Sequence, residues 1–422
     1  MKLSSMSIGR ALRVGGVWGS LLALASCGGG GGGGGTPGAS TAPPDPSSGL
    51  VASSSVAQHC AVPRSTDVQG TAADEKTWVR SWIDETYLWY RDVRALSAAT
   101  LNPAAYATTV DYFDALKSPL LTASGAKKDR FHFVYDTPTW VALSQSGVSY
   151  GYGFEIALVA ATPPRKAVVA YTSPGTPAVT AGIARGAQIL RVDGVDLVND
   201  GTGAGVDVLN AGLFPTAAGP HTFSVLDLGA SVPHNVTLTA AALATATVQN
   251  VKTLPAPNQS VGYLQFNDHL ATSEAELVAA INQLKTSGIT DLVLDMRYNG
   301  GGYLDIAAEL AYMIAGAGPT TAKVFEQQTF NDKNPFQLTA GQTITPFFAT
   351  SPGGFSLASG TPLPTLNLSR VYMLVGGGTC SASEAVVNGL RGVGVQVNLI
   401  GATTCGKPYG FYPQDNCGTT YF

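Results

Sequence analysis

The stretch DLVLDMRYNGGGYL, Asp291–Leu304, decides the fold. Its first part, Asp291–Arg297, reads as a short strand of the buried type, because apolar residues dominate it without a clear polar face. Three consecutive glycines, Gly300–Gly302, follow at once and lead into Leu304–Ala315, which has helical apolar spacing. A buried strand that turns through glycines into a helix is typical of an α/β fold with a parallel sheet.

The same alternation of strands and helices continues on both sides of this stretch. Further strands are expected at Val261–Phe266, Arg370–Val375 and Val395–Gly401, and further helices at Ser273–Ser287 and Ala382–Arg391. We expect Ser273 to cap its helix, with Glu276 three residues later. The pattern predicts crossover connections and a mixed, largely parallel sheet for residues 246–422.

Two glycine-rich junctions in this region carry candidate chemistry. Gly300–Gly302 lie at a helix start, where backbone N–H groups and the helix dipole stabilise negative charge on a ligand oxygen. Gly376–Gly378 end the next strand, and Ser381 follows at the next helix start. A serine there is more often a simple N-cap than a nucleophile, and no Gly-x-Ser-x-Gly motif surrounds this one.

A nucleophilic serine needs a base, because the free hydroxyl is unreactive near neutral pH. The five histidines lie in no recognisable base motif, and each reads as structural or surface. Lys407, in the turn-rich stretch just past the last strand, is the remaining candidate. Desolvation lowers the pKa of a lysine, so a lysine buried beside Ser381 could accept the hydroxyl proton.

Residues 148–245 show a different pattern, with short strands and frequent turns. A glycine-flanked turn at Tyr152, Gly153 and Phe154 runs into a strand, and a short helix and an Asp193-Gly194 turn follow. This order resembles a PDZ domain, whereas the alternative is another small β-rich domain with ordinary turns. The resemblance implies that Tyr152, Gly153 and Phe154 form the loop that binds a peptide carboxylate, while the peptide adds a strand to the sheet edge.

The motifs together resemble the C-terminal processing peptidases, also called tail-specific proteases. The resemblance rests on Asp291–Leu304, the Ser381-Ala382-Ser383-Glu384 block, the Gly406-Lys407 turn and the PDZ-like module. It implies an endopeptidase that cleaves proteins near a bound C-terminus, with Ser381 as nucleophile and Lys407 as general base. By the same resemblance, the oxyanion hole would use N–H groups of Ala382 and of Gly301 or Gly302. Ser383 fits the block less well than Ser381.

Three features depart from the family pattern. The spacing from Ser381 to Lys407 is about one residue longer than expected. The family often has a lysine-orienting glutamine one helical turn after the lysine, where this chain has Phe411, and Gln414 is the nearest substitute. Cysteines also flank both candidate catalytic positions. A catalytically inactive PDZ-containing lipoprotein that acts as a scaffold is therefore the alternative function.

The two ends of the folded region are less regular. Residues 59–147 read as a small helical N-terminal domain, with helices expected at Asp74–Tyr90 and Asp111–Lys117 and with aromatic residues in its core. At the other end, Thr419–Phe422 reads like the start of a strand. We therefore expect the protease core, residues 246–422, to be truncated at the C-terminus.

The first 58 residues read as a targeting signal followed by a flexible linker. Residues 1–27 have a basic start, a short apolar run and a final Leu-Ala-Ser-Cys, which resembles a lipobox with Cys27 as the lipidated residue. An ordinary signal peptide is the alternative. Residues 28–58, rich in Gly, Pro and Ser, form a flexible linker. These features predict a lipid-anchored protein of the bacterial envelope, on the outer membrane and facing the periplasm.

Composition limits the partners. The net charge of −4 and the absence of a clustered basic face give no reason to expect nucleic acid. No His-Glu-x-x-His and no paired His/Cys spacing is present, so no metal or other cofactor is expected. Cys60, Cys380, Cys405 and Cys417 allow three disulfide connectivities, among which a Cys405–Cys417 pair on one short loop is favoured. The expected partners are protein or peptide C-termini and, through the anchor, a membrane.

Overall fold

The computed structural model describes residues 49–422, and these form two compact units. One unit comprises Thr137–Gln327 and Ile344–Tyr412, and the other comprises residues 49–136, Gln328–Thr343 and Pro413–Phe422. Cys27, the predicted signal peptide and most of the predicted linker lie outside the described residues. No helix among residues 49–422 combines the length and the apolar character needed to cross a membrane.

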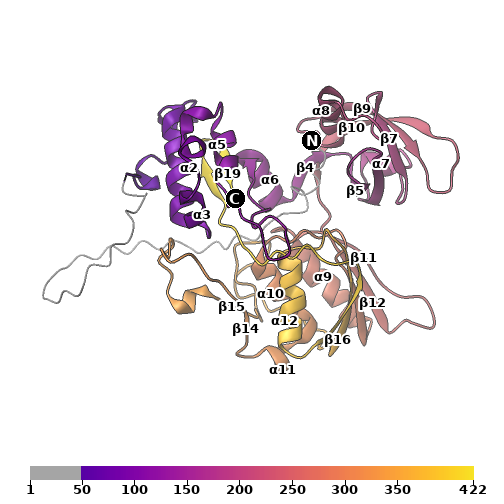
Figure 1. Cartoon of the computed structure of the whole chain (residues 1–422). Helices are drawn as coiled ribbons and strands as arrows, with labels where there is room; N and C mark the ends of the chain where they lie inside the picture. Colours follow the sequence, from indigo (N-terminus) through magenta and orange to yellow (C-terminus); the bar gives the residue numbers. More distant parts are fainter. Residues whose placement is uncertain (1–48) are drawn as a thin grey trace, which may run out of the picture. The chain divides into compact units, whose positions relative to one another are not determined.

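The unit that contains Pro413–Phe422 is mainly helical (Figure 1). Its elements are η1 Ser53–Ser55, β1 His59–Cys60, β2 Val68–Gln69, α2 Ala72–Thr86, α3 Tyr90–Arg94, α4 Ala98–Leu101, η2 Pro103–Ala105, α5 Thr109–Ala115, β3 Val134–Asp136, η3 Ala340–Thr343, β18 Gln414–Asn416 and β19 Thr419–Tyr421. A capping box starts α2, because the Thr71 hydroxyl accepts from the Asp74 N–H at 3.2 Å and the Thr71 N–H donates to the Asp74 carboxylate at 2.8 Å.

The predicted helix Asp74–Tyr90 is two helices in the structure. The first, α2, ends at Thr86, and α3 starts at Tyr90, so Leu88 lies between them and is 40% exposed. Trp78 is buried as expected and stacks on Trp82 with ring centroids 5.3 Å apart. The aromatic core expected from the sequence is therefore present, but the apolar spacing overestimated the length of one helix.

The last residues of the chain fold into this helical unit. β19 pairs antiparallel with β18 and with β3, and the disulfide Cys60–Cys417 joins two segments that are 357 residues apart. Tyr421 is buried and its ring lies 5.2 Å from that of Trp78. Compared with the predicted boundaries, the helical unit thus gains residues 328–343 and 413–422.

The other unit begins with α6 Thr137–Ser146 and a seven-stranded, antiparallel sheet. The strand order is β4-β10-β9-β7-β6-β5, with β8 paired to β7. The bounds are β4 Val148–Gly151, β5 Phe154–Ala160, β6 Lys166–Thr172, β7 Gln188–Val192, β8 Val195–Asp196, β9 Gly219–Leu226, β10 His234–Ala244, α7 Pro177–Thr180 and α8 Gly203–Leu213. A separate hydrophobic cluster, including Val169, Ile189, Leu209 and Phe223, fills the space between this sheet and α8.

A five-stranded mixed sheet follows, with the order β11-β12-β13-β16-β17. Its first pair is antiparallel and the other three pairs are parallel. The bounds are β11 Val248–Thr253, β12 Val261–Phe266, β13 Asp291–Asp295, β16 Arg370–Val375, β17 Gln396–Gly401, α9 Ser273–Thr286, α10 Leu304–Ala315, α11 Ala317–Thr320 and α12 Ala382–Gly392. A short antiparallel pair, β14 Val324–Gln327 and β15 Ile344–Pro346, lies outside this sheet.

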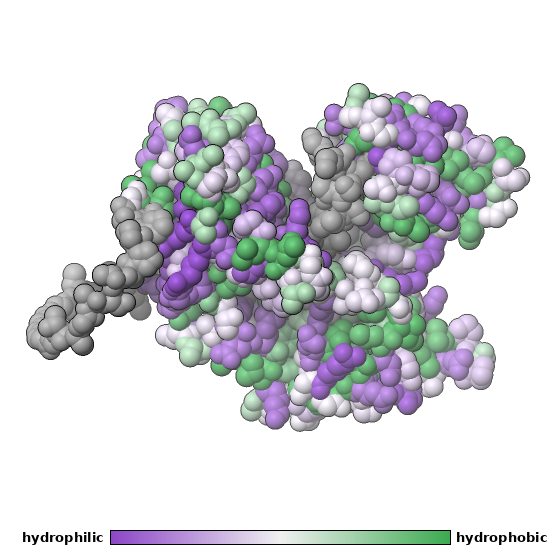
Figure 2. Space-filling model, viewed as in Figure 1, coloured by the Kyte–Doolittle hydropathy of each residue, from purple (hydrophilic) through white to green (hydrophobic). Residues whose placement is uncertain are grey.

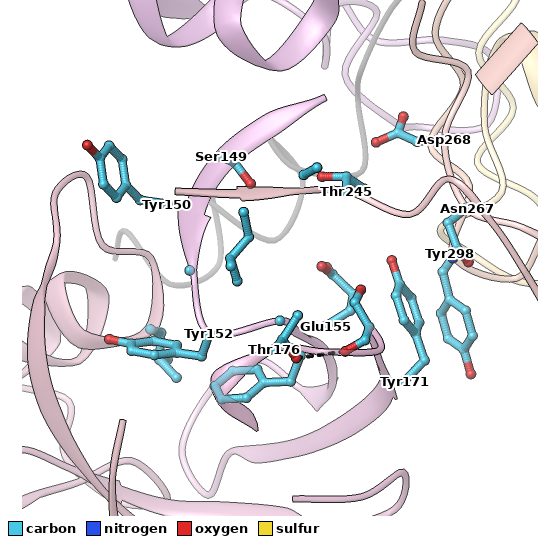
Figure 3. Close-up of a pocket in the computed structure, with 17 residues that line it drawn as sticks. Ser149, Tyr150, Tyr152, Glu155, Tyr171, Thr176, Thr245, Asn267, Asp268 and Tyr298 are labelled. Carbon is cyan, nitrogen blue, oxygen red and sulfur yellow. Dashed lines mark hydrogen bonds between the residues drawn. The ribbon is translucent and has the colours of Figure 1, made fainter. Parts of the chain in front are cut away.

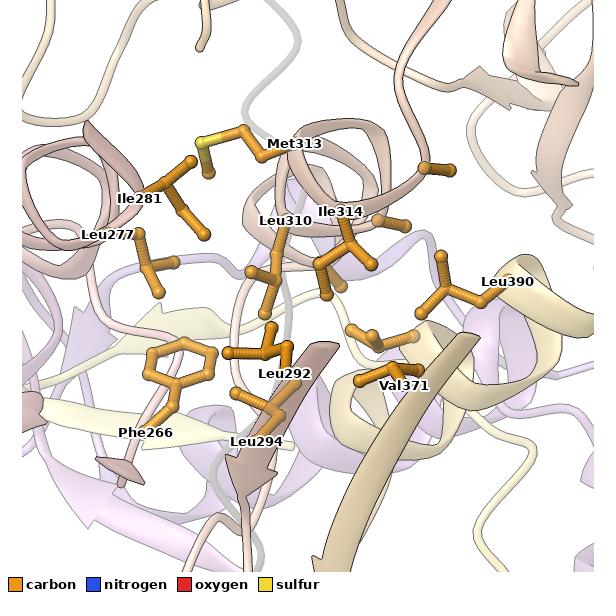
Figure 4. Close-up of a cluster of buried hydrophobic side chains, with 14 of the residues drawn as sticks. Phe266, Leu277, Ile281, Leu292, Leu294, Leu310, Met313, Ile314, Val371 and Leu390 are labelled. Atoms are coloured by element: carbon orange, nitrogen blue, oxygen red, sulfur yellow. The ribbon is translucent and has the colours of Figure 1, made fainter. Parts of the chain in front are cut away.

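One hydrophobic cluster binds the helices to this sheet (Figure 4). Leu292 and Leu294 of β13, Leu310 of α10 and Leu390 of α12 are fully buried and converge in this cluster. Truncating one such leucine to alanine typically costs about 2–5 kcal/mol. The buried-strand pattern of Asp291–Arg297 is explained by this packing, although the strand itself ends at Asp295.

Strand β17 is the end strand of the five-stranded order, and part of its apolar surface is exposed. Leu399 and Ile400 are 41% and 52% exposed. Figure 2 shows other hydrophobic residues lying among hydrophilic ones on the visible face of the molecule. Single exposed apolar residues are common on protein surfaces and need no special role.

The start of α9 differs from the predicted cap. Ser273 is the first helical residue, and its hydroxyl donates to the Leu270 carbonyl at 2.6 Å. The Glu276 carboxylate instead accepts from the Thr247 hydroxyl at 2.8 Å and the Val248 N–H at 2.9 Å. The carboxylate therefore holds the start of β11 against the helix, a tertiary contact that the local sequence pattern does not encode.

Candidate active site

Three loops meet at one edge of the five-stranded sheet. Because β13, β16 and β17 are parallel and adjacent, their carboxyl ends lie at the same edge, with Asp295 opposite Leu374 and Val375 opposite Gly401. Each of these strands leads into one candidate segment. Gly300–Gly302, called the glycine turn below, follow β13, the segment before Ser381 follows β16, and the segment that contains Lys407 follows β17. The topology therefore brings together motifs that are more than 100 residues apart in the chain.

Ser381 lies at a sharp turn between β16 and α12. Its backbone has φ 56° and ψ −117°, a left-handed conformation that is unusual for a residue with a side chain. The Thr379 hydroxyl fixes the turn, because it donates to the Met296 carbonyl at 2.7 Å and accepts from the Gly376 N–H at 3.0 Å. A strained strand-to-helix turn is the way in which α/β hydrolases present a nucleophile, although the chain lacks their sequence motif.

The two serines of the block differ in what they contact. The Ser383 side chain is fully buried, and its hydroxyl donates to the Asn299 carbonyl at 3.1 Å. Ser381 retains 9% exposure at the mouth of α12. Ser383 thus has a structural contact with the glycine turn, and Ser381 is the one of the two that solvent reaches.

Glu384 joins the turn at Ser381, called the serine turn below, to residues 402–407, called the lysine loop. Its Oε2 accepts from the Ser381 N–H at 2.9 Å and from the Lys407 N–H at 2.9 Å. Its Oε1 accepts from the Gly406 N–H at 2.8 Å and from the Thr404 hydroxyl at 2.7 Å. The backbone nitrogens of Ser381 and Lys407 are therefore no further apart than twice the length of one such hydrogen bond. No sequence pattern predicted this role of Glu384.

Lys407 is buried, with 4% of its surface exposed. Its Nζ lies 3.8 Å from the centroid of the Phe411 ring, the residue that stands where the family often has glutamine. Gln414 lies in β18, in the other unit, and its amide donates to the Asp415 carbonyl at 3.2 Å. An aromatic ring is therefore a close neighbour of the lysine amine.

The predicted Cys405–Cys417 disulfide is wrong. Cys380 pairs with Cys405, and Cys417 pairs with Cys60. Cys380 directly precedes Ser381, and Cys405 lies two residues before Lys407. Short sequence spacing misled the prediction, because the register of β16 against β17 sets which cysteines meet.

The glycine turn packs directly against Ser381. A Cβ placed on Gly301 would lie 2.9 Å from the Ser381 Cβ and 3.0 Å from the Ala382 nitrogen, so only glycine fits there. The Gly301 N–H already donates to Asn299 Oδ1 at 3.0 Å. Of the predicted oxyanion-hole donors, the N–H groups of Gly302 and Ala382 remain as the candidates.

A buried histidine and asparagine fix this turn. His269 Nδ1 lies 2.9 Å from Asn299 Oδ1, and the Asn299 amide donates to the Phe266 carbonyl at 3.1 Å. The backbone N–H of His269 also donates to the Gly301 carbonyl at 3.0 Å. Burial lowers the pKa of His269 to about 4, so the imidazole is neutral at neutral pH and Nδ1 carries the proton toward the amide oxygen. No motif around His269 predicted this role.

The predicted peptide-binding turn lines a pocket of about 80 Å³ (Figure 3). Tyr152, Gly153 and Phe154 contribute to its wall together with Thr176, Asp268 and, near the glycine turn, Tyr298. The Tyr152 ring itself is buried in the core of the seven-stranded domain, and its hydroxyl donates to the Gly212 carbonyl at 2.7 Å. Only the main chain of Tyr152 is thus available to a ligand.

Residues 49–422 contain one group of side chains with metal-ligand spacing, namely Cys380, Glu384 and Cys405. Both sulfurs of that group belong to the Cys380–Cys405 disulfide. A disulfide sulfur is not a thiolate ligand, and the carboxylate is engaged by the four donors described above. This group therefore serves as a cross-link rather than as a metal centre.

Comparisons with known proteins agree with this architecture. Residues 260–410 match the model of peptidase family S41, and residues 74–133 match that of the peptidase S41 N-terminal domain. The two matches together take in half of the chain. A carboxyl-terminal-processing protease of Synechocystis is 28% identical over 233 residues, which are 55% of this chain and 47% of that protein. A protein of the same name from Picosynechococcus is 27% identical over 234 residues, or 56% and 49%.

A solved structure shows the same fold. A crystal structure described as an S41 protease candidate of Bacteroides fragilis superposes with a TM-score of 0.56 at 24% identity, over 82% of this chain and 83% of that one. The chain belongs to peptidase family S41. It spans about half the length of the curated relatives it matches.

Proposed function

We propose that this chain is a serine endopeptidase in which Ser381 is the nucleophile and Lys407 the general base. One observation carries the proposal: the backbone N–H groups of Ser381 and Lys407 donate to the same oxygen of Glu384, each at 2.9 Å. The strained backbone at Ser381 adds support, because such strain persists mainly where the surrounding structure holds a functional residue.

The chemistry follows from these positions. The neutral amine of Lys407 accepts the Ser381 hydroxyl proton while Oγ attacks the peptide carbonyl carbon. The carbonyl oxygen becomes negative and is stabilised by the N–H groups of Ala382 and Gly302, the latter held in place by Asn299 and His269. The C–N bond then breaks, and the Lys407 ammonium returns its proton to the leaving amine. Water, with the same amine as base, cleaves the acyl-enzyme ester.

The seven-stranded domain is proposed to be a PDZ-like module that binds the substrate C-terminus. Gly153 has φ +86°, and its carbonyl accepts from the Ser173 N–H at 2.7 Å, which anchors the turn. Tyr152, Gly153 and Phe154 share their pocket with Asn267, Asp268 and Tyr298, which border the glycine turn of the core. A carboxylate bound at that turn would leave the preceding peptide close to the core. The relatives named for carboxyl-terminal processing fit this role.

We also propose that the protein is anchored to the bacterial envelope, facing the periplasm, by a lipid on Cys27. The lipobox-like sequence and the Gly/Pro/Ser-rich stretch after it support the anchor. Two disulfides among residues 49–422 fit an oxidising compartment such as the periplasm. Globomycin treatment should leave the unprocessed precursor, whereas Cys27→Ala should abolish labelling by a fatty-acid analogue. A labelled Cys27→Ala protein would contradict the anchor.

The catalytic proposal is tested with a fluorophosphonate probe and with casein digestion. The wild type should be labelled and active, whereas Ser381→Ala and Lys407→Ala should lose both properties while remaining folded by circular dichroism. Wild-type activity should rise with pH, because only the neutral amine accepts the proton. A folded wild type that neither labels nor digests protein, yet binds peptides through the PDZ-like module, would instead establish the scaffold function.

A further inference from the structure

A covalent cross-link lies immediately beside both proposed catalytic residues. Cys380 precedes Ser381, and its disulfide partner Cys405 lies in the loop that ends at Lys407. The cysteines are 25 residues apart and meet because β16 and β17 deliver their loops to one sheet edge. The disulfide thus connects the serine turn directly to the lysine loop.

The two cysteines of the disulfide differ in burial and in the structure around them. Cys380 is buried, and its N–H donates to the Asn299 carbonyl at 3.2 Å, so it belongs to the same packed layer as the glycine turn. Cys405 is partly exposed and lies in residues 403–413, which contain no helix or strand. Its N–H donates to the Thr379 carbonyl at 3.0 Å. A segment without helix or strand is therefore tied to the packed serine turn at this point.

Besides the disulfide, one carboxylate ties the lysine loop to the start of α12. The Thr404 hydroxyl and the N–H groups of Gly406 and Lys407 all donate to Glu384. A segment held by a few partly exposed hydrogen bonds opens more readily than a packed strand. The disulfide is the one covalent tie between this loop and the serine turn among the described residues.

We propose that Cys380 and Cys405 are positioning residues of the Ser381–Lys407 pair, so that catalysis depends on their disulfide. This inference rests on the proposed function and deepens it. Without the bond, the lysine loop samples positions in which the amine is displaced from the serine hydroxyl. A displacement of about 1 Å at a reacting group can lower a rate on the order of 100-fold.

The same dependence makes the enzyme sensitive to reduction. A dithiol such as dithiothreitol attacks one sulfur, the S–S bond breaks, and the resulting mixed disulfide is resolved as the reagent closes to its own cyclic disulfide. The two protein sulfurs gain two electrons and two protons and become thiols. Attack is expected at Cys405, the more exposed sulfur, where the Glu384 carboxylate at 3.4 Å from Sγ would slow an approaching thiolate.

The test compares two matched double variants of the full chain. Cys380→Ser/Cys405→Ser removes the proposed positioning bond, and Cys60→Ser/Cys417→Ser removes the disulfide of the helical unit as the control. The first should lower kcat about 10- to 100-fold with KM within about threefold. The control should keep kcat within about threefold at temperatures where it is folded. Equal kcat in the two variants would overturn the proposal.

Hydrogen exchange separates this inference from the proposed function. The Gly406 and Lys407 amides, which donate to Glu384, should exchange at least about tenfold faster in Cys380→Ser/Cys405→Ser than in the control variant. Unchanged exchange at these amides would contradict the positioning role even if the protein proved not to be a peptidase. If the wild type lacked peptidase activity and the Gly406 and Lys407 amides still exchanged faster in Cys380→Ser/Cys405→Ser, only the catalytic proposal would be contradicted.

A reduction series covers the case in which the double variant does not fold. In the Cys60→Ser/Cys417→Ser protein, dithiothreitol can open only the Cys380–Cys405 bond among the described residues. Alkylation and peptide mass analysis measure the reduced fraction at each concentration. Activity should fall in proportion to that fraction and return on reoxidation. Full activity after complete alkylation of Cys380 and Cys405 would refute the inference.

Discussion

Glu384 accepts a hydrogen bond of 2.9 Å from the backbone N–H of Lys407, which lies 23 residues further along the chain. The same carboxylate oxygen accepts from Ser381, and the second oxygen accepts from Gly406 and Thr404. Hydrogen bonds to a charged group are each worth about 1.5–3 kcal/mol. The first turn of α12 thus organises the lysine loop as well as its own helix.

We predict that Glu384→Gln lowers kcat about 10- to 100-fold, with a smaller effect on KM. The amide keeps one acceptor oxygen but turns the other into a donor, which faces N–H groups instead of accepting from them. Steady-state kinetics on a peptide substrate measures the change. Glu276→Gln is the matched control, because Glu276 also accepts from a hydroxyl and a backbone N–H but does so at β11. Equal losses of kcat in the two variants would mean that Glu384 acts through stability alone.

The two serines of the Ser-Ala-Ser-Glu block should respond differently to alanine. Ser383→Ala removes one buried hydrogen bond to the Asn299 carbonyl, at a cost in unfolding free energy of about 1 kcal/mol. Probe labelling should therefore persist within about tenfold of wild type, because the nucleophile and the lysine loop remain. Ser381→Ala should abolish labelling. If Ser383→Ala abolished labelling and Ser381→Ala did not, the two assignments would have to be exchanged.

Much of this arrangement was predictable because local patterns dictated it. The buried strand at Asp291, the glycine turn after it and the helix at Leu304 each follow from apolar spacing and backbone freedom. The expected strands also put the glycine turn, Ser381 and Lys407 after successive strands, and the structure shows that these strands are adjacent in the sheet. The mixed sheet and the N-terminal helical domain are present in the structure.

What the sequence could not predict depends on contacts between distant segments. Glu384 reads as an ordinary acidic residue in the first turn of a helix, and only the fold brings the lysine loop to it. The Cys60–Cys417 bond spans 357 residues, so loop length gave no hint of it. His269 bears no motif, and its burial beside Asn299 appears only once the strands are assembled.

Gly153→Ala should impair peptide binding without affecting the dyad. Gly153 has φ +86°, and an added Cβ would lie 2.2 Å from the Thr176 Cβ, so the turn must move. We expect KM for a peptide with a free apolar C-terminus to rise about tenfold or more, whereas fluorophosphonate labelling stays near wild type. Gly175→Ala is the control, since Gly175 has φ +71° but open space around it.

The C-terminal carboxylate of the peptide provides a second arm of that experiment. C-terminal amidation should weaken binding to the wild type, because the proposed turn recognises a charged terminus. The same amidation should have little further effect on Gly153→Ala. Equal affinity of the free and amidated peptides for the wild type would rule out the carboxylate role of Tyr152, Gly153 and Phe154.

Glu309 is expected to make the folded state less stable as pH rises. Its side chain on α10 is fully buried, and this burial, together with the nearby Glu274, raises its pKa from 4.5 to about 9. The folded chain therefore holds a proton that the unfolded chain releases above pH 4.5. The stabilisation from this neutral acid is complete below that pH and is lost progressively until pH passes about 9.

Glu309→Gln keeps a neutral side chain of similar shape at every pH, so it should remove this dependence. The variant should be more stable than wild type by up to about 5 kcal/mol near pH 8, because each pH unit above the unfolded pKa of 4.5 removes about 1.36 kcal/mol from the wild type. Below pH 4.5 the two proteins should have similar stability. Urea unfolding between acidic and alkaline pH measures both effects, with Asp207→Asn, an exposed carboxylate on α8, as the control. Parallel stability curves for wild type and Glu309→Gln would mean that Glu309 is already ionised in the folded protein.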